Sequence, residues 1–244
     1  MSDLKNFTLV CDRRMRRLPV ACIERWVQDT PRRRRCVPGN KGLRYPASPP
    51  SPDDMRAILD ATFHPDMGLS RKLGLLGLRN RALFVCLWRS GLRIHEALLL
   101  RPDDLDFEHC TVTVRRGKGG KRRIVGIDRH ALTEINAWLH IRALLGLGLD
   151  EPVFCVIEGD RRGAPLNQSY VRTRLHHAAR VAGVLTRTAP HQLRHSCAVE
   201  LARAGTPVPL ISMQLGHSNV ATTATYLQGI SPEEVIAVMA GRTW

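Results

Sequence analysis

Aromatic side chains are scarce in this chain of 244 residues, at 5% of the sequence, although hydrophobic residues reach 43%. A core of ordinary size is therefore expected, built mainly from Leu, Val, Ile and Ala. No apolar run approaches the roughly 18 residues that a membrane span requires. The first thirty residues carry too many charges for a secretory leader. The sequence thus predicts a soluble protein of the cytoplasm.

The seven cysteines include no CxxC pair, and their number is odd. This pattern argues against a disulfide framework and against a zinc ribbon, and it favours small apolar side chains in a reducing compartment. A phosphate-binding GxxxxGK[ST] loop is also missing. Asp103, Asp104 and Asp106 follow a predicted helix and are interpreted as a cap or turn. The sequence therefore predicts neither a metal nor any other cofactor.

Acidic residues are outnumbered, 22 against 37 Lys and Arg, so the net charge is +15 and the pI is near 10.5. Such an excess favours a polyanionic partner, nucleic acid above all. A solubilising surface and an acidic protein partner remain alternatives on charge alone. Residues 1–50 supply +8 of the total, and Arg32, Arg33, Arg34 and Arg35 form a block that is expected to contact DNA phosphates.

Two regions are predicted. Residues 1–50 are interpreted as a basic appendage and linker, with a short helix from Pro19 through Trp26 and then a proline-rich stretch. Residues 51–244 are predicted to form the main domain. Ser51 can cap its first helix, Pro52 suits the first helical position, and Asp53 and Asp54 complement the helix dipole.

Periodicity within the main domain predicts a mainly α fold with a small antiparallel β-sheet, an α+β class. Two strands flank a basic hairpin tip, and most of the remaining segments are helical. The predicted helices cover 52–63, 78–88, 93–100 and 131–145, and the predicted strands cover 111–114, 123–127 and 153–157. The chain is predicted to be helical from Asn167 onward, with separate helices at 190–204, 207–215, 218–227 and 232–239.

Several short motifs could bind a phosphate, although each is weak alone. His191 and Arg194 lie three residues apart, on one face of a predicted helix. Arg93 follows a glycine break at a predicted helix start, and His217 follows Gly216 in a tight turn. Taken singly, the pair is better explained as a solvated helix face and the histidine as a structural residue, and Arg93 can equally be an ordinary surface arginine.

The order and spacing of these motifs change the interpretation. The chain resembles the tyrosine recombinase (phage integrase) family from about Ser51 to its C-terminus. The resemblance is carried by Ser90-Gly91-Leu92-Arg93, the Gly117-Lys118-Gly119 tip, His191-x-x-Arg194-His195, Leu215-Gly216-His217, and Tyr226 after Thr222-Thr223-Ala224-Thr225. It implies the catalytic-domain fold of that family and six catalytic residues: Arg93, Lys118, His191, Arg194, His217 and Tyr226.

Physical chemistry gives each of these residues a coherent role. A phosphodiester under attack gains negative charge on its non-bridging oxygens, which Arg93, Arg194 and His217 can stabilise. Tyr226 can attack the phosphorus, and because its reference pKa is near 10 it needs a base, for which His191 is the candidate. Lys118 can protonate the leaving 5′-oxygen, with Lys121 as a weaker rival.

The resemblance implies a 3′-phosphotyrosyl intermediate, no ATP or metal, and a site-specific recombinase that integrates or excises phage or mobile-element DNA. It also implies specific double-stranded DNA as the partner, action in the cytoplasm of a bacterial host, and a monomer that forms a tetramer on DNA. Lys121 and Arg122 are further candidate DNA contacts. Glu96 either orients Arg93 or is a surface acid. Val235, Val238 and Met239 form a short apolar stripe, which is expected to dock either on a neighbouring copy of the chain or on its own domain.

The sequence departs from the family in one respect. Only about 50 residues precede the main domain, too few for the core-binding domain that members usually carry. Two other functions remain open: a type IB topoisomerase, which uses a similar tyrosine, and a DNA-binding accessory without catalysis. A metal-dependent nuclease lacks its carboxylate cluster.

Overall fold

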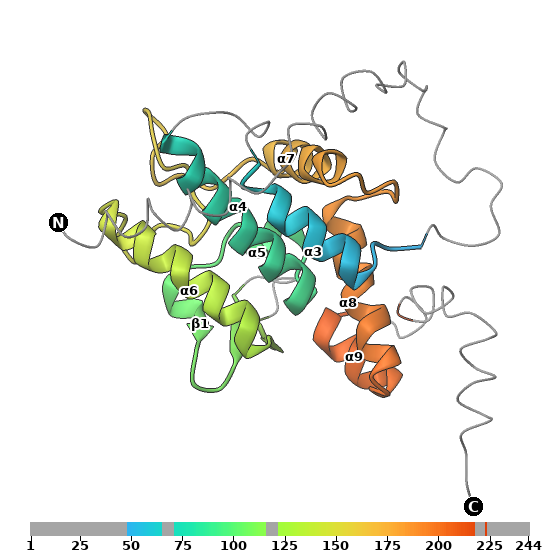
Figure 1. Cartoon of the computed structure of the whole chain (residues 1–244). Coiled ribbons are helices and arrows are strands. Elements are labelled where there is room, and N and C mark those ends of the chain that lie inside the picture. Colours follow the sequence, from blue (N-terminus) through green and yellow to red (C-terminus); the bar gives the residue numbers. More distant parts are fainter. Residues whose placement is uncertain (1–47, 65–70, 116–121, 218–222, 224–244) are drawn as a thin grey trace, which may run out of the picture. The chain divides into compact units, whose positions relative to one another are not determined.

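The structure of the chain, a computed structural model, describes residues 48–64, 71–115 and 122–217 together with Thr223. Helices dominate it, and a small sheet lies among them (Figure 1). In chain order the elements are α3 (Pro52–Ala61), α4 (Arg71–Ser90), α5 (Ile94–Ala97), the 3-10 turn η2 (Pro102–Asp104), β1 (Leu105–Asp106), β2 (Thr111–Val114), β3 (Arg123–Gly126), α6 (Arg129–Leu144), α7 (Gln168–Val181), α8 (Pro190–Arg203) and α9 (Val208–Leu215). The predicted α+β class is confirmed.

The first helix begins as the sequence predicts. The Ser51 hydroxyl accepts a hydrogen bond from the Asp54 amide at 3.1 Å, and the Asp54 carboxylate accepts one from the Ser51 amide at 3.0 Å. Pro52 takes the first helical position, where its missing N–H has no consequence. Met55, Ile58 and Leu59 are buried on one face of α3, which packs against α7.

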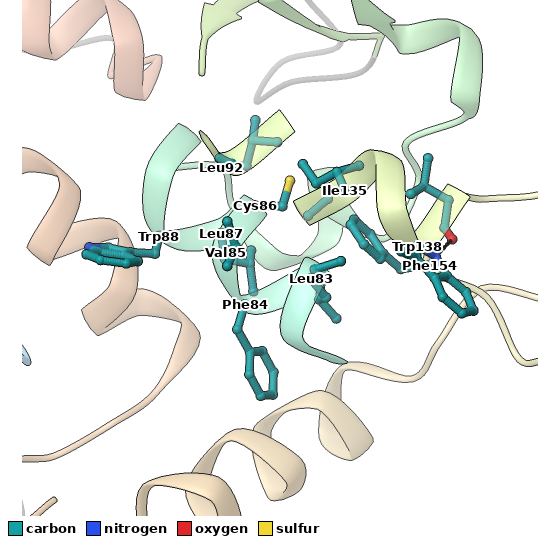
Figure 2. Packing of buried hydrophobic residues seen from close by; sticks show 14 of the residues in the cluster. Leu83, Phe84, Val85, Cys86, Leu87, Trp88, Leu92, Ile135, Trp138 and Phe154 are labelled. Atoms are coloured by element: carbon teal, nitrogen blue, oxygen red, sulfur yellow. Dashed lines mark hydrogen bonds between the residues drawn. The ribbon is translucent and has the colours of Figure 1, made fainter. Parts of the chain in front are cut away.

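Helix α4 forms the centre of the core. Its run from Ala82 to Trp88 is buried, and the helix packs against α6 on one side and α8 on another. Figure 2 shows Phe84, Leu83 and Leu87 of α4 with Ile135 and Trp138 of α6. Large side chains of this kind, fully removed from water, supply most of the favourable free energy of folding. The core therefore holds the C-terminal end of α4 in a fixed place.

The sheet has three antiparallel strands in the order β1-β2-β3. In β2 the pairs run from Thr111 opposite Gly126 to Val114 opposite Arg123, which confirms the predicted hairpin strands. Val112 and Val114 are buried while Thr111 and Thr113 are partly exposed, as the alternation predicts. The two-residue strand β1 was not predicted, because it is too short to show a period of two.

The predicted strand at 153–157 is wrong. Cys155 makes only an isolated bridge with Pro165. Side chains bond two carbonyls of this segment: the Trp138 indole donates to Val153 at 2.8 Å, and Arg79 donates to Cys155 at 2.9 Å. The Val156 carbonyl accepts from the Gly163 amide at 2.8 Å. Buried carbonyls require a partner, but the partner need not be a strand.

Several helix boundaries differ from the prediction. Helix α4 starts seven residues earlier than expected, and the helix expected at 93–100 is a single turn, α5. Helices α8 and α9 lie where they were expected. The helices predicted at 19–26 and 232–239, the hairpin tip, nearly all of the appendage and, apart from Thr223, the helix predicted at 218–227 lie outside the described residues. None of the described helices is both long and apolar enough to cross a membrane.

The described cysteines fit the interpretation as small apolar residues. Cys86, Cys155 and Cys197 are buried, Cys110 is partly buried, and all four are free thiols. Burial raises the pKa of Cys86 and Cys197 to about 12, so these thiols stay protonated at neutral pH.

Candidate functional site

Arg93 lies at a sharp break between two helices. Helix α4 ends at Ser90, and Gly91 then adopts the left-handed conformation, with φ of +66°, that glycine tolerates best. Arg93 is the N-cap of α5. Its Nη2 donates to the Gly216 carbonyl at 3.1 Å, and its Nη1 donates to Glu96 Oε1 at 3.1 Å. The guanidinium is thus held between the start of α5 and the end of α9.

Arg194 occupies the same region from the opposite side. It belongs to α8 and is buried, with 2% of its surface exposed. Its Nη1 donates to the Gly91 carbonyl and its Nη2 to the Leu215 carbonyl, both at 2.6 Å. Arg194 therefore joins the end of α4 to the end of α9.

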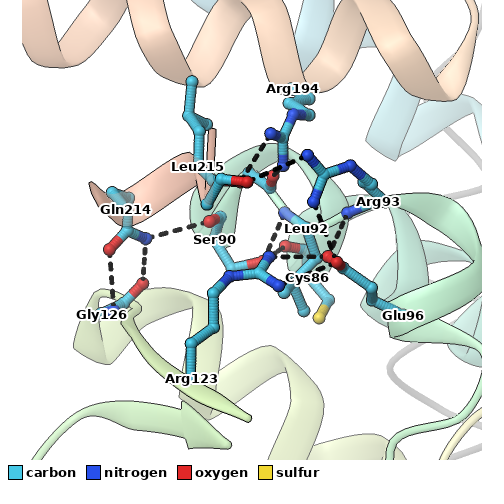
Figure 3. Close-up of polar contacts among 12 residues, drawn as sticks. Cys86, Ser90, Leu92, Arg93, Glu96, Arg123, Gly126, Arg194, Gln214 and Leu215 are labelled. Atoms are coloured by element: carbon cyan, nitrogen blue, oxygen red, sulfur yellow. Dashed lines mark hydrogen bonds and ion pairs between the residues drawn. The ribbon is translucent and has the colours of Figure 1, made fainter. Parts of the chain in front are cut away.

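The two arginines converge on one turn. Arg93 bonds Gly216 and Arg194 bonds Leu215, two consecutive carbonyls, and Figure 3 shows both guanidinium groups beside this turn. Gly216 caps α9 in the left-handed conformation, with φ of +64°. Residues 93 and 194 are 101 positions apart in sequence, so only the tertiary fold brings them together.

His217 follows this turn directly. Its Nδ1 lies 2.8 Å from the Thr223 hydroxyl oxygen. Lost hydration, followed by the charges of Arg194 and Arg93, lowers the pKa of His217 to about 4. The imidazole is therefore neutral at pH 7 in the unliganded protein.

His191 shares the same positive environment from the first turn of α8. Lost hydration lowers its pKa, and so do the charges of Arg194, His195, Arg187 and Arg93, although much of the residue remains exposed. A neutral imidazole can accept a proton. Arg93, His191, Arg194 and His217 are thus gathered into one cationic region.

Glu96 is buried beneath Arg93, with its side chain 0% exposed. Its Oε2 accepts from the Arg93 amide at 2.9 Å, and a second guanidinium, that of Arg123 on β3, donates to both carboxylate oxygens at 2.8 Å. Burial alone would raise the pKa of Glu96, but the bonds from Arg123 and Arg93 outweigh it and lower the pKa to about 2. Of the two interpretations left open, the structure shows the one in which Glu96 orients Arg93.

Gln214 of α9 joins three elements around the site. Its side-chain nitrogen donates to the Ser90 carbonyl at 2.9 Å and to the Gly126 carbonyl at 2.7 Å. Its side-chain oxygen accepts from the Gly126 amide at 2.9 Å. One amide therefore connects α9 to the end of α4 and to β3 (Figure 3).

Of the remaining predicted site residues, the structure describes only Arg122. Lys118, Lys121, Tyr226 and the block from Arg32 to Arg35 lie outside the described residues, and Arg122 is exposed just before β3. Arg123, Gln214 and Thr223 were missed. Arg123 is one of several basic residues in a row, and no local pattern shows that it alone pairs with a carboxylate 27 positions earlier.

Asp104 and Asp106 make local contacts, as expected for a cap or turn, and Asp103 lies in the 3-10 turn η2. Asp104 accepts from the Arg101 amide at 2.9 Å, and Asp106 accepts from the His109 amide at 2.8 Å. In the part of the chain that the structure describes, no three His, Cys, Asp or Glu side chains are placed to hold a metal ion.

Sequence comparison places residues 52–230 in the family model described as the phage integrase family. Among curated proteins, the tyrosine recombinase XerD of Mycobacterium leprae is 35% identical over 192 residues, which cover 78% of this chain and 58% of XerD. The tyrosine recombinase XerC of Halalkalibacterium halodurans is 34% identical over 209 residues, covering 83% of this chain and 64% of XerC.

Solved structures share the fold. The XerA recombinase superposes with a TM-score of 0.66 at 21% identity, covering 85% of this chain and 68% of XerA. A Tn1549 transposon integrase in complex with transposon right end DNA gives a TM-score of 0.60 at 19% identity, covering 90% of this chain and 75% of that chain.

Because the family model covers most of its length, the chain belongs to the phage integrase family, that of the tyrosine recombinases. It spans only 58% of the XerD relative and 64% of the XerC relative.

Proposed function

We propose that this chain is a site-specific DNA recombinase that cuts and rejoins strands through a 3′-phosphotyrosyl intermediate. The observation that carries the proposal is the convergence of Arg93 and Arg194 on the carbonyls of Gly216 and Leu215, with His217 next in the chain. Two guanidinium groups and an imidazole at one point form a site for a phosphate whose charge increases during attack. Donors of this kind typically contribute about 3–4 kcal/mol each to transition-state stabilisation.

The proposed nucleophile is Tyr226. The chain has three tyrosines, at positions 45, 170 and 226. Tyr170 is committed elsewhere, because its hydroxyl lies 2.7 Å from Nη2 of the buried Arg79. Tyr226 lies nine positions after His217. Its oxygen would attack the phosphorus, the bond to the 5′-oxygen would break, and the freed 5′-hydroxyl would later reverse the reaction on another strand.

Two proton transfers accompany this reaction. The lowered pKa of His191 keeps it neutral, so it can take the tyrosine proton. Lys118, or Lys121 as its rival, would supply the proton to the leaving 5′-oxygen. His217 would donate to a non-bridging oxygen through Nε2, which requires its Nδ1 to accept from the Thr223 hydroxyl.

The rest of the chain has proposed roles in DNA binding and assembly. Residues 1–50 would act as a basic appendage that contacts phosphates through Arg32–Arg35, and residues 51–244 as the catalytic domain. Arg122 would extend the DNA contact beside the hairpin. Val235, Val238 and Met239 would dock on a neighbouring copy in a tetramer. The reaction would serve phage or mobile-element integration and excision in a bacterial cytoplasm.

The proposal is tested by covalent trapping. Tyr226→Phe protein selects its preferred site from a pool of random duplexes, and that site is then built as a nicked suicide substrate and incubated with EDTA. Wild-type protein and the matched control Tyr170→Phe should form an adduct that survives detergent, whereas Tyr226→Phe should form none. An adduct in the Tyr226→Phe variant would remove the proposed nucleophile.

The same material separates the competing functions. Relaxation of any supercoiled plasmid, without exchange between two selected sites, would identify a topoisomerase. Specific binding without an adduct in the wild type would identify an accessory protein. Cleavage that EDTA abolishes would identify a metal-dependent nuclease, and it would contradict the proposed reaction.

A further inference from the structure

Arg123 forms a two-pronged ion pair beneath the site. It is the first residue of β3, and its Nη1 and Nη2 donate to Oε1 and Oε2 of Glu96, both at 2.8 Å. Its side chain is 17% exposed and that of Glu96 is fully buried. Paired bonds of this kind fix the orientation of both groups, because a guanidinium matches a carboxylate at two points at once.

Glu96 transmits this orientation to Arg93. Both of its oxygens already accept from Arg123, and they also accept from Nη1 and the backbone amide of Arg93. The carboxylate can therefore change its rotamer only by breaking bonds to both arginines. Arg93 cannot readily leave Gly216 while Glu96 holds it at the other end.

Gly216 completes the contact from the other side. A Cβ built on Gly216 would lie 2.6 Å from Arg123 Nε and 2.8 Å from its Cζ, so the guanidinium fills the space beside this glycine. That Nε is buried and has no hydrogen-bond partner among the described residues. Leaving a buried donor unsatisfied is unfavourable, so the Nε does not help to hold the side chain. The position of Arg123 is set by its bonds to Glu96 and by its packing against Gly216.

We propose that Arg123 is a positioning residue for the cleavage reaction, which holds Glu96 so that Arg93 faces the scissile phosphate. The cleavage reaction in this inference rests on the proposed function. The orientation of Arg93 by Arg123 and Glu96 does not depend on that function. An arginine side chain that is not held has many accessible rotamers, and a donor misplaced by about 1 Å can cost about 100-fold in rate. Arg123 removes that freedom before DNA binds.

The test uses a variant that keeps the positive charge but removes the two-point hydrogen bonding of the guanidinium to Glu96. In Arg123→Lys the net charge is unchanged, but one ammonium cannot bond both oxygens of Glu96 in this geometry. We expect its single-turnover rate of adduct formation on the suicide substrate to fall at least tenfold, with DNA binding within twofold of wild type. The matched control is Arg161→Lys, in an exposed loop, which should retain the wild-type rate.

A neutral substrate separates positioning from general damage. If Arg123 acts through Arg93 on the phosphate charge, its loss should matter much less when a methylphosphonate replaces the scissile phosphate. An equal slowing on both substrates would show a structural role and overturn the proposal. The double variant Glu96→Gln with Arg123→Lys should be no slower than the worse single variant, because both changes break one contact. Additive losses would contradict action through Glu96.

If the wild type forms no adduct, the role of Arg123 is tested by measuring the affinity for inorganic sulfate by NMR. Failure of the wild type to cleave would defeat the proposed function alone. Arg123→Lys and Glu96→Gln should each weaken sulfate binding about tenfold relative to Arg161→Lys, while a melting curve confirms that each variant folds. Unchanged sulfate affinity in both folded variants would overturn the role of Arg123. If Arg123→Lys does not fold, Glu96→Gln breaks the same contact from the other side.

Discussion

At the scale of single residues, Gly216 is restricted twice, by its backbone and by its neighbour. Its φ of +64° disfavours any side chain, and a Cβ would meet Arg123 Nε at 2.6 Å. We expect Gly216→Ala to lower the free energy of unfolding by about 1 kcal/mol from the backbone alone, and further through displacement of Arg123. Urea denaturation measures the total.

Gly205 provides the matched control for this prediction. It also has a positive φ, of +78°, but nothing lies within 4 Å of the position that a Cβ would take there. Gly205→Ala should therefore show the backbone cost without the clash. If the two alanine variants lose the same stability and bind sulfate equally well, the close contact between Gly216 and Arg123 has no energetic consequence.

His217 predicts how stability depends on pH. Its folded pKa of about 4 lies below its ordinary value of 6.5, so between these values the unfolded chain binds more protons than the folded one. The free energy of unfolding should therefore fall as pH decreases from about 6.5 to 4. His217→Gln should flatten this part of the curve.

The measurement is a series of urea melts across that pH range. His140→Gln, a change at an exposed histidine of α6, gives the effect of losing a surface imidazole. A wild-type curve that is flat between pH 6.5 and 4 would contradict the lowered pKa of His217.

At the scale of elements, the start of α6 is fixed by one side chain with two partners. Asp128 accepts from the Ala131 amide at 2.9 Å as the N-cap, and it accepts from Arg89 of α4 at 2.6 Å. Asp128→Ala should lower the free energy of unfolding by about 1–2 kcal/mol, the cost of losing a cap. Chemical denaturation measures the loss.

Asp150→Ala is the control for the loss of an exposed ion pair. Asp150 is fully exposed and meets Arg101 at 3.3 Å, so its removal should cost less than about 0.5 kcal/mol. Equal losses at Asp128 and Asp150 would mean that the cap at α6 contributes nothing.

The elements that sequence could predict are those with local signals. Ser51 and Pro52 start α3, Gly91 ends the α4 region and Pro190 starts α8, each through short-range chemistry. The segment 153–157 was wrongly predicted as a strand because it contains buried apolar residues. Its carbonyls at Val153 and Cys155 accept hydrogen bonds from the distant side chains of Trp138 and Arg79. Burial and strand formation give the same sequence pattern there.

The candidate site divides in the same way. The order and spacing of the family motifs singled out Arg93, His191, Arg194 and His217, and the structure brings these four residues close together. Arg123 and Gln214 could not be predicted, because their partners lie 27 and 88 positions away. Contacts of that range leave no periodic or capping signal in a single sequence.

At the scale of the whole molecule, the net charge of +15 predicts salt-sensitive DNA binding. Each phosphate contact should contribute about 0.9 to the slope of log affinity against log salt. Changing Arg32–Arg35 together to Gln should reduce that slope by at most about 3.6, if all four side chains contact phosphates. Fluorescence anisotropy with a labelled duplex across a salt series gives both slopes.

The control replaces Arg161 and Arg162, two exposed arginines of another segment, with Gln. This change should leave the slope nearly unaltered. A quadruple variant with the wild-type slope would show that the arginine block does not contact DNA phosphates, and the proposed role of residues 1–50 would then be wrong.

The amide of Gln214 also limits which sequences can occupy that position. It donates to two carbonyls and accepts from one amide within a single side chain. Glutamate, although nearly the same shape, would turn a carboxylate oxygen toward two carbonyl oxygens, and methionine would remove the hydrogen bond to the carbonyl of the buried Ser90 and leave the exposed Gly126 to water. A library randomised at this codon and screened for folded protein should return glutamine almost alone.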